Sequence, residues 1–139
     1  MAGARRATTL VIAYMAMNKT PAPDDADRVY EVAAELFSVM ATPLRLKIIS
    51  ALCHGEKSVG QLLADIATTQ PNMSQHLSQL YRAGIVDKRR EGTQVFYRVC
   101  NEKAVSLCRA VCTQIAIEFD DPRAVEPSQR LAPARALGL

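Results

Sequence analysis

The stretch TQPNMSQHLSQLYRAG, residues 69–84, decides the fold that this sequence predicts. Thr69 is a typical helix cap, Pro71 is tolerated in a first helical turn, and Gly84 suits the position just past a helix end. One face of the predicted helix is an apolar stripe at helical spacing, made of Met73, Leu77, Leu80 and Tyr81. The other face carries polar, non-acidic side chains: Gln70, Asn72, Ser74, Gln75, Ser78 and Gln79. Such a face suits base edges in the DNA major groove, although an ordinary solvated amphipathic helix has the same pattern.

The segments on either side of this helix predict a helix-turn-helix followed by a hairpin. Ser58 caps a short helix over 59–67, and two threonines then make a tight connection into the helix that follows. After Gly84, residues 85–90 and 94–99 read as two strands joined by a turn. The consecutive Lys88, Arg89 and Arg90 place positive charge on this hairpin, where it can contact the sugar-phosphate backbone.

Three further helices complete the predicted fold, over 25–41, 43–53 and 102–119. Thr42 caps the second of these ahead of a proline, and Asn101 caps the last. The expected class is mostly α (α+β), a winged helix-turn-helix with the order helix, helix, helix, helix, strand, strand, helix. We expect the folded domain to span 24–120. Residues 1–23 read as a flexible extension or a mis-assigned start, and 121–139 as a disordered tail.

Composition limits the classes of function. A chain of 139 residues with 49% hydrophobic residues holds one domain with a real core. The net charge of +3 is mild, so the placement of the basic residues is more informative than their number. Four cysteines without a convincing signal peptide or a membrane-spanning run favour a cytoplasmic protein with free thiols. No acid/base or nucleophile constellation is visible beyond the thiols, so we do not expect an enzyme.

Three segments of the sequence resemble the ArsR/SmtB family of bacterial winged-helix repressors. They are FSVMATPLRLKIISAL (37–52), GEKSVGQL (55–62) and NMSQHLSQLYRAGIVDKRREGTQVFYRV (72–99), and the resemblance covers about 29–119. It implies a homodimer joined through the first and last helices, a palindromic operator in double-stranded DNA, and an inducer that releases the DNA. It also places Ser74, Gln75 and His76 at base edges.

The predicted DNA-binding set combines the helix face with the basic hairpin. It comprises Gln70, Asn72, Ser74, Gln75, His76, Ser78, Gln79, Lys88, Arg89, Arg90 and Arg98.

The metal ligands that the resemblance would call for are missing. The helix that carries a cysteine pair in the family's arsenic, cadmium and lead sensors reads SVGQLLADI here, over 58–66. The last helix contains no histidine, whereas zinc, nickel and cobalt sensors carry His and Asp ligands there. His54 falls in a turn and His76 in the DNA-reading helix, and neither has a ligand partner nearby in sequence. The sequence therefore predicts neither a bound metal nor a cofactor.

Thiols are the remaining candidates for sensing. The segments GEKSVGQL and LCRAVC resemble the subgroup that responds to persulfide or sulfide, including regulators of sulfur oxidation. In that subgroup a cysteine of the second helix pairs with one of the last helix, which here implies Cys53 and Cys112. Each lies about one turn from the usual position, in opposite directions. Cys108 is a possible additional thiol. We expect cross-linking by reactive sulfur species to disturb the last helix and release the operator.

Three alternatives stay open at the level of sequence. The first is that the cysteines are inert core residues, because a buried cysteine behaves as a small hydrophobe. The second is a trithiolate site for arsenite or a related soft metal, made by Cys53, Cys108 and Cys112. The third is a DNA-architectural or interaction module that senses nothing.

Cys108 and Cys112 are four residues apart on one helix, with Cβ atoms roughly 5–6 Å apart. A disulfide needs about 3.5–4.5 Å, and extra sulfur atoms would relax that requirement.

Overall fold

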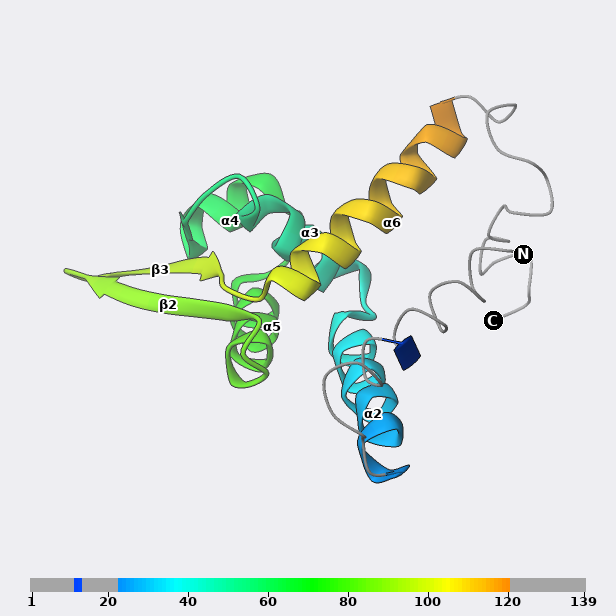
Figure 1. Ribbon diagram of the computed structural model, residues 1–139. Helices are drawn as coiled ribbons and strands as arrows, with labels where there is room; N and C mark the ends of the chain where they lie inside the picture. Colours follow the sequence, from blue (N-terminus) through cyan, green and yellow to red (C-terminus); the bar gives the residue numbers. More distant parts are fainter. Residues whose placement is uncertain (1–11, 14–22, 121–139) are drawn as a thin grey trace. The chain divides into compact units, whose positions relative to one another are not determined.

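The computed structural model describes residues 12–13 and 23–120, and the fold predicted from the sequence is confirmed within them (Figure 1). Five helices and three strands are defined in this part of the chain: α2 (Pro23–Met40), α3 (Pro43–Leu52), β1 (Lys57–Ser58), α4 (Val59–Asp65), α5 (Gln70–Arg82), β2 (Val86–Glu91), β3 (Gln94–Val99) and α6 (Glu102–Asp120). Each helix end lies within two residues of the predicted one. The predicted extension over 1–23 and the predicted tail over 121–139 lie outside the described residues, apart from 12–13 and 23.

The chain divides into two compact units, one ending at Val39 and one beginning at Met40. Helix α2 belongs to the first unit, and every other named element belongs to the second. None of the described helices has the length and apolar character needed to cross a membrane.

Local hydrogen bonds explain where the helices of the second unit begin. At each predicted cap a side-chain oxygen accepts the backbone N–H three residues on, at 3.2–3.3 Å: Thr42 from Arg45, Ser58 from Gln61, Thr69 from Asn72 and Asn101 from Ala104. Ser58 is part of a full capping box, since its own N–H donates to the Gln61 side chain. Gly84 follows α5 with a φ of +74°, a conformation that strongly favours glycine, as expected for a helix stop.

Helix α3 lies at the centre of the second unit. Its Ile48 and Ile49 are completely buried, and the helix contacts α4, α5, α6 and β3. Helix α5 contributes three fully buried side chains, Met73, Leu77 and Leu80. The predicted apolar stripe of α5 is therefore confirmed except at Tyr81, which is 42% exposed. Tyr81 lies at the edge of the stripe, where Lys88 from the hairpin covers one face of its ring instead of core side chains.

The sheet has one strand more than predicted. Strands β2 and β3 form the expected antiparallel hairpin, and the two residues of β1 pair with the outer edge of β3, giving the order β1-β3-β2. The sequence predicts no strand at these residues, whereas in the structure Lys57 is paired with Tyr97. A strand of two residues is too short to show the alternation by which strands are recognised, and its pairing depends on a tertiary contact.

We expect Leu77→Ala to lower the free energy of unfolding by about 2–5 kcal/mol, because the change leaves a cavity beneath α5. Chemical denaturation at fixed protein concentration measures it. Gln75→Ala on the exposed face of the same helix is the control, with an expected change within about 0.5 kcal/mol. Equal losses for the two variants would contradict the packing described above.

Candidate nucleic-acid interface and thiol cluster

The outer face of α5 presents the polar side chains that the sequence predicted for it. Of the predicted DNA-binding residues on α5, four are exposed: Gln70, Asn72, Ser74 and Gln75. The other three, His76, Ser78 and Gln79, are half-buried. The face is partly pre-ordered by its own hydrogen bonds. Asn72 Nδ2 donates to Thr68 Oγ1 at 2.9 Å, and Arg82 Nη2 donates to Ser78 Oγ at 3.3 Å. This arrangement leaves a face without a carboxylate that is free to meet base edges.

His76 is held by a residue that the sequence did not single out. The Nε of Arg45 in α3 donates to His76 Nδ1 at 3.1 Å, across 31 positions of sequence. Local patterns could not reveal this contact, because it depends on how α3 packs against α5. Arg45 thereby joins the central helix to the helix that is predicted to read DNA.

The hairpin has two chemically different faces. In the register of β2 and β3, Lys88 is opposite Tyr97 and Arg90 is opposite Val95, and residues opposite each other point to the same face. Lys88 Nζ lies 4.4 Å from the centroid of the Tyr81 ring, so this face is turned toward α5. Lys88 and Arg90 are both exposed on it. They place positive charge beside α5, the helix that is predicted to read DNA and that we call the recognition helix.

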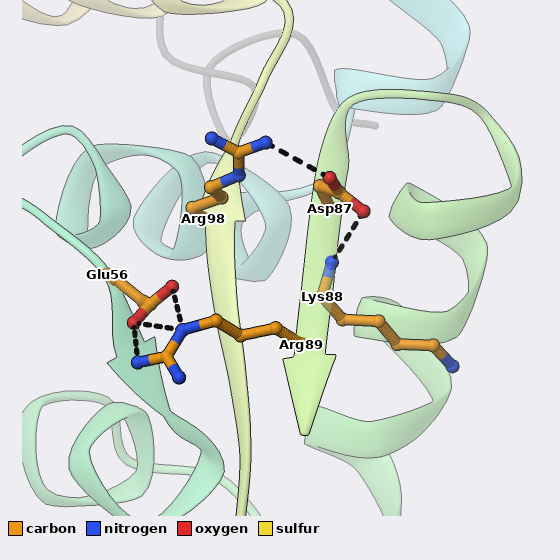
Figure 2. Close-up of a pocket in the computed structure, with 5 residues that line it drawn as sticks. All are labelled: Glu56, Asp87, Lys88, Arg89 and Arg98. Atoms are coloured by element: carbon orange, nitrogen blue, oxygen red, sulfur yellow. Dashed lines mark hydrogen bonds and ion pairs between the residues drawn. The ribbon is translucent and has the colours of Figure 1, made fainter. Parts of the chain in front are cut away.

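The other face carries arginines that already have internal partners (Figure 2). Arg89 reaches across β3, and its Nε donates to both carboxylate oxygens of Glu56 at 2.9 Å. Arg98 donates to Asp87 at 3.2 Å. These residues and Lys88 line a shallow surface pocket. The predicted DNA-binding arginines on this face, Arg89 and Arg98, are therefore already paired with carboxylates of the chain.

The ion pairs shift the pKa values of three residues, Glu56, Asp87 and Arg89. The hydrogen bond from Arg89 lowers the pKa of Glu56, and the backbone N–H of Lys88, followed by Arg98, lowers that of Asp87. Hydrogen bonds from Arg89 to Glu56 and Glu91 raise the pKa of Arg89. Glu56, Arg89 and Arg98 are exposed and Asp87 is half-buried, so water and salt screen the attraction within these pairs.

The thiol cluster brings together two of the predicted sensing residues directly. Cys108 Sγ and Cys112 Sγ, one turn apart on α6, lie 3.9 Å from each other. Cys108 is buried, and its thiol donates to the carbonyl oxygen of Leu46 in α3 at 3.7 Å. Cys112 is exposed and Cys53 is half-buried at the end of α3. The thiol of Cys100 lies elsewhere, against the carbonyls of Gly84 and Ile85.

Burial weakens the acidity of the Cys108 thiol. It raises the pKa of Cys108 to about 11, with smaller contributions from the hydrogen bond to Cys112, from the charge of Cys112 and from that of Cys53. Cys108 therefore responds electrostatically to both of the other thiols. Among the described residues no group of three His, Cys, Asp or Glu side chains could hold a metal ion. This gives no support to a trithiolate metal site.

We expect removal of either cation on the α5-facing side of the hairpin to weaken DNA binding in a salt-dependent way. Lys88→Ala and Arg90→Ala should each lower the slope of log K against log salt by about 1, because each phosphate contact releases one counterion. Arg98→Ala is the matched control, since Arg98 is an exposed arginine of the opposite face with its own carboxylate. Fluorescence anisotropy over a salt series measures the slopes. An equal drop for Arg98→Ala would disprove the division into two faces.

The thiols should react with iodoacetamide at unequal rates. Only the thiolate reacts, and with a pKa of about 11 Cys108 is about one part in a thousand thiolate at pH 8. Exposed Cys112 should be alkylated first, and the rate at Cys108 should climb as the pH rises from 9 toward 11. Peptide mass spectrometry over a time course follows each site. Faster labelling of Cys108 than of Cys112 at pH 8 would contradict the described burial.

Comparison with known proteins places this geometry in a family. A sequence profile described as "Bacterial regulatory protein, arsR family" matches residues 42–88. The biofilm growth-associated repressor of Agrobacterium fabrum is 43% identical over 95 residues, which cover 68% of this chain and 80% of that protein. The crystal structure of the transcriptional repressor BigR from Xylella fastidiosa has a TM-score of 0.61 and 36% identity, covering 67% of this chain and 95% of that one.

A second solved structure is similar to the same extent. Reduced HlyU from Vibrio cholerae has a TM-score of 0.59 and 31% identity, covering 63% of this chain and 92% of that one. The matched proteins are regulators rather than enzymes, which confirms the prediction that the chain has no catalytic role. With the helix-turn-helix, the hairpin and these similarities together, the chain belongs to the arsR family of bacterial regulatory proteins and is a DNA-binding transcriptional regulator.

Proposed function

We propose that this protein is a cytoplasmic homodimeric repressor that binds a palindromic operator and releases it when Cys112 is cross-linked by reactive sulfur species. The observation that carries the proposal is the contact between an exposed and a buried thiol, Cys112 and Cys108, 3.9 Å apart on α6. Names of similar proteins support repression, since the Agrobacterium fabrum protein and the Xylella fastidiosa structure are both described as repressors. One similar structure is described as the reduced form of its protein, which supports redox chemistry in this group.

Exposed apolar side chains support a dimer through the first and last helices. On α6, Val111, Ile117 and Phe119 are 50%, 45% and 82% exposed in the single chain. Helix α2 carries a similar set, made of Val29, Tyr30, Val32 and Phe37. Apolar side chains gathered along one helix at this exposure are typical of a surface that another chain covers. Each helix is thus suited to contact a second copy.

The thiol distances favour a bridge that contains extra sulfur. A direct disulfide requires Sγ atoms about 2.05 Å apart, so the 3.9 Å between Cys108 and Cys112 would have to shrink considerably. Chains with one or two additional sulfur atoms, with bonds of the same length, span about 3.3 and 4.3 Å. A trisulfide or tetrasulfide therefore fits the observed separation with little movement. Cys53 remains the partner that we predict for Cys112, and Cys108 is the alternative that is already in contact.

The chemistry needs only the persulfide itself as oxidant. The Cys112 thiolate attacks the outer sulfur of a persulfide R–S–SH, which gives Cys112–S–SH and releases R–S⁻. The partner thiol reacts likewise with a second persulfide. The first cysteine persulfide, as Cys112–S–S⁻, then attacks the inner sulfur of the partner's persulfide, forms Cys–S–S–S–Cys and releases HS⁻. Two thiols are oxidised, and the transferred sulfur that leaves is reduced to sulfide.

A link between the thiols can reach the DNA-binding helix through α3. The thiol of Cys108 donates to the carbonyl of Leu46, and the next residue toward the N-terminus, Arg45, holds His76 on α5. A bridge at Cys108 removes the S–H that is donated to Leu46, and a bridge to Cys53 joins α6 to the end of α3, so either bridge changes the contacts between α6 and α3. Because α6 also carries the proposed dimer surface, the spacing of the two recognition helices changes with it. Half-sites lie about 34–36 Å apart on DNA, so a small change in spacing loses several contacts together.

Two other functions compete with this proposal. A soft-metal repressor using Cys53, Cys108 and Cys112 is disfavoured, because the described residues offer no group of three ligands. A DNA-architectural module without sensing would bind DNA equally well whatever the state of its thiols. The same titration therefore separates all three readings when it is run with polysulfide, with arsenite and with neither.

We expect anaerobic treatment with sodium tetrasulfide to lower operator affinity at least about tenfold, a coupling of ordinary size for a regulator. Mass spectrometry should show a bridge from Cys112 with one or two extra sulfur atoms, and peptide mapping should show whether Cys53 or Cys108 is its partner. Cys112→Ser should keep its DNA affinity under the same treatment. Cys100→Ser, which changes a thiol outside the cluster, is the control and should respond like the wild type. An unmodified Cys112 with unchanged DNA binding would rule the proposal out.

A further inference from the structure

The hydrogen bond between Arg45 and His76 fixes more than a side-chain position. A guanidinium group can only donate, so the nitrogen that receives its N–H must carry a lone pair. That nitrogen is Nδ1 of His76, at 3.1 Å from Arg45 Nε. A neutral imidazole that accepts at Nδ1 has its proton on Nε2. The contact with α3 therefore selects one tautomer of a histidine on the recognition helix.

The second ring nitrogen of His76 is accessible to a ligand. Within the described part of the chain, Nε2 makes no hydrogen bond, since the bond from Arg45 is the one that His76 has there. In the same residues no buried side-chain nitrogen or oxygen lacks a partner. Nε2 must then reach the solvent, which agrees with the half-buried state of His76. The ring has one nitrogen turned to α3 and one turned outward.

We infer that Arg45 is a positioning residue that holds His76 as the Nε2–H tautomer, so that His76 offers DNA a hydrogen-bond donor and no acceptor. Its partner on the duplex is then an acceptor: a purine N7, guanine O6, thymine O4 or a phosphate oxygen. The exocyclic amines of cytosine and adenine are donors and are rejected. This inference rests on the proposed role of α5 in reading DNA, whereas the tautomer itself does not.

The glutamines and asparagine on the outer face of α5 behave differently from His76. Each amide both donates and accepts, so it can meet either kind of base edge. Serine hydroxyls have the same freedom. Among the polar side chains predicted to contact DNA from α5, His76 is the one whose hydrogen-bonding character is set by another helix. It therefore contributes discrimination between donors and acceptors that the rest of the face lacks.

Nuclear magnetic resonance of protein labelled with ¹⁵N in histidine tests the tautomer without DNA. The chain has 2 histidines, so the spectrum contains two rings, and exposed His54 is the internal reference. When both imidazole rings are neutral, the two ring nitrogens of His76 should differ far more in ¹⁵N chemical shift than those of His54. The shifts should also show that the proton of the His76 ring is on Nε2. Arg45→Met should reduce that difference toward the value of His54. Protonation at Nδ1, or no response to Arg45→Met, would overturn the inference.

Two isosteric variants test what the outward nitrogen does on DNA. The amide of Asn occupies the place of Nδ1 and can accept from Arg45, while the amide of Gln occupies the place of Nε2 and can donate outward. Arg45 takes part in a further interaction, so these variants are cleaner probes than a change at Arg45 itself. On a duplex selected by the wild type from a random pool, His76→Asn should bind about fivefold more weakly, the effect of one lost hydrogen bond. His76→Gln should bind nearly as well as the wild type.

The identity of the acceptor follows from substituted duplexes. If the acceptor is N7, replacing that purine by its 7-deaza analogue should lower the duplex affinity of the wild type and of His76→Gln about fivefold. The affinity of His76→Asn should not change. A methylphosphonate that shows this pattern instead identifies a phosphate. His54→Asn is the control for a histidine change elsewhere. Equal affinities for the two His76 variants, or a larger loss for His76→Gln, would overturn the donor assignment. Loss of all selective DNA binding by the wild type would instead refute the proposed function and leave the tautomer result standing.

Discussion

The burial of α3 between α5 and α6 is the constraint on which the rest of the second unit depends. Its sequence, PLRLKIISAL, is apolar on most sides, and such a helix is stable only when neighbours cover it nearly all round. Ile48 and Ile49 are completely buried, and both the recognition helix and the thiol-bearing helix contact α3. The polar face of α5 and the thiols of α6 are therefore both attached to one central helix.

Much of this fold could be predicted because its boundaries are set by local chemistry. Thr42, Ser58, Thr69 and Asn101 each accept a backbone N–H three residues on, a pattern that is contained in the sequence itself. The buried stripe of α5 is likewise a local pattern, since Met73, Leu77 and Leu80 recur at helical spacing. The polar outer face of α5 could be predicted for the same reason, since a helix that buries one stripe leaves its opposite face exposed.

The features that the sequence did not reveal all depend on tertiary contacts. Arg45 meets His76 across 31 positions, and Glu56 meets Arg89 across 33. Neither pair has a spacing that a helix or strand would produce. The same holds for β1, which is defined by its pairing with Phe96 and Tyr97. The contact between Cys108 and Cys112 is different, because four residues along one helix already place them together, and only their unequal burial needed the structure.

The difference between exposed and buried contacts determines which route a signal can take. The ion pairs on the hairpin lie in water and are screened by salt, so they adjust the charge available to DNA but hold the sheet only weakly. The contacts of α3 centre on the buried side chains of Ile48, Ile49 and Leu52, and a packed core changes arrangement as a unit rather than deforming gradually. The bridge that we propose at α6 would act on this packed side of the molecule, where α6 contacts α3. The contacts of α6 with α3 lead to the start of α3, where Leu46 accepts from Cys108 and Arg45 holds the ring of His76.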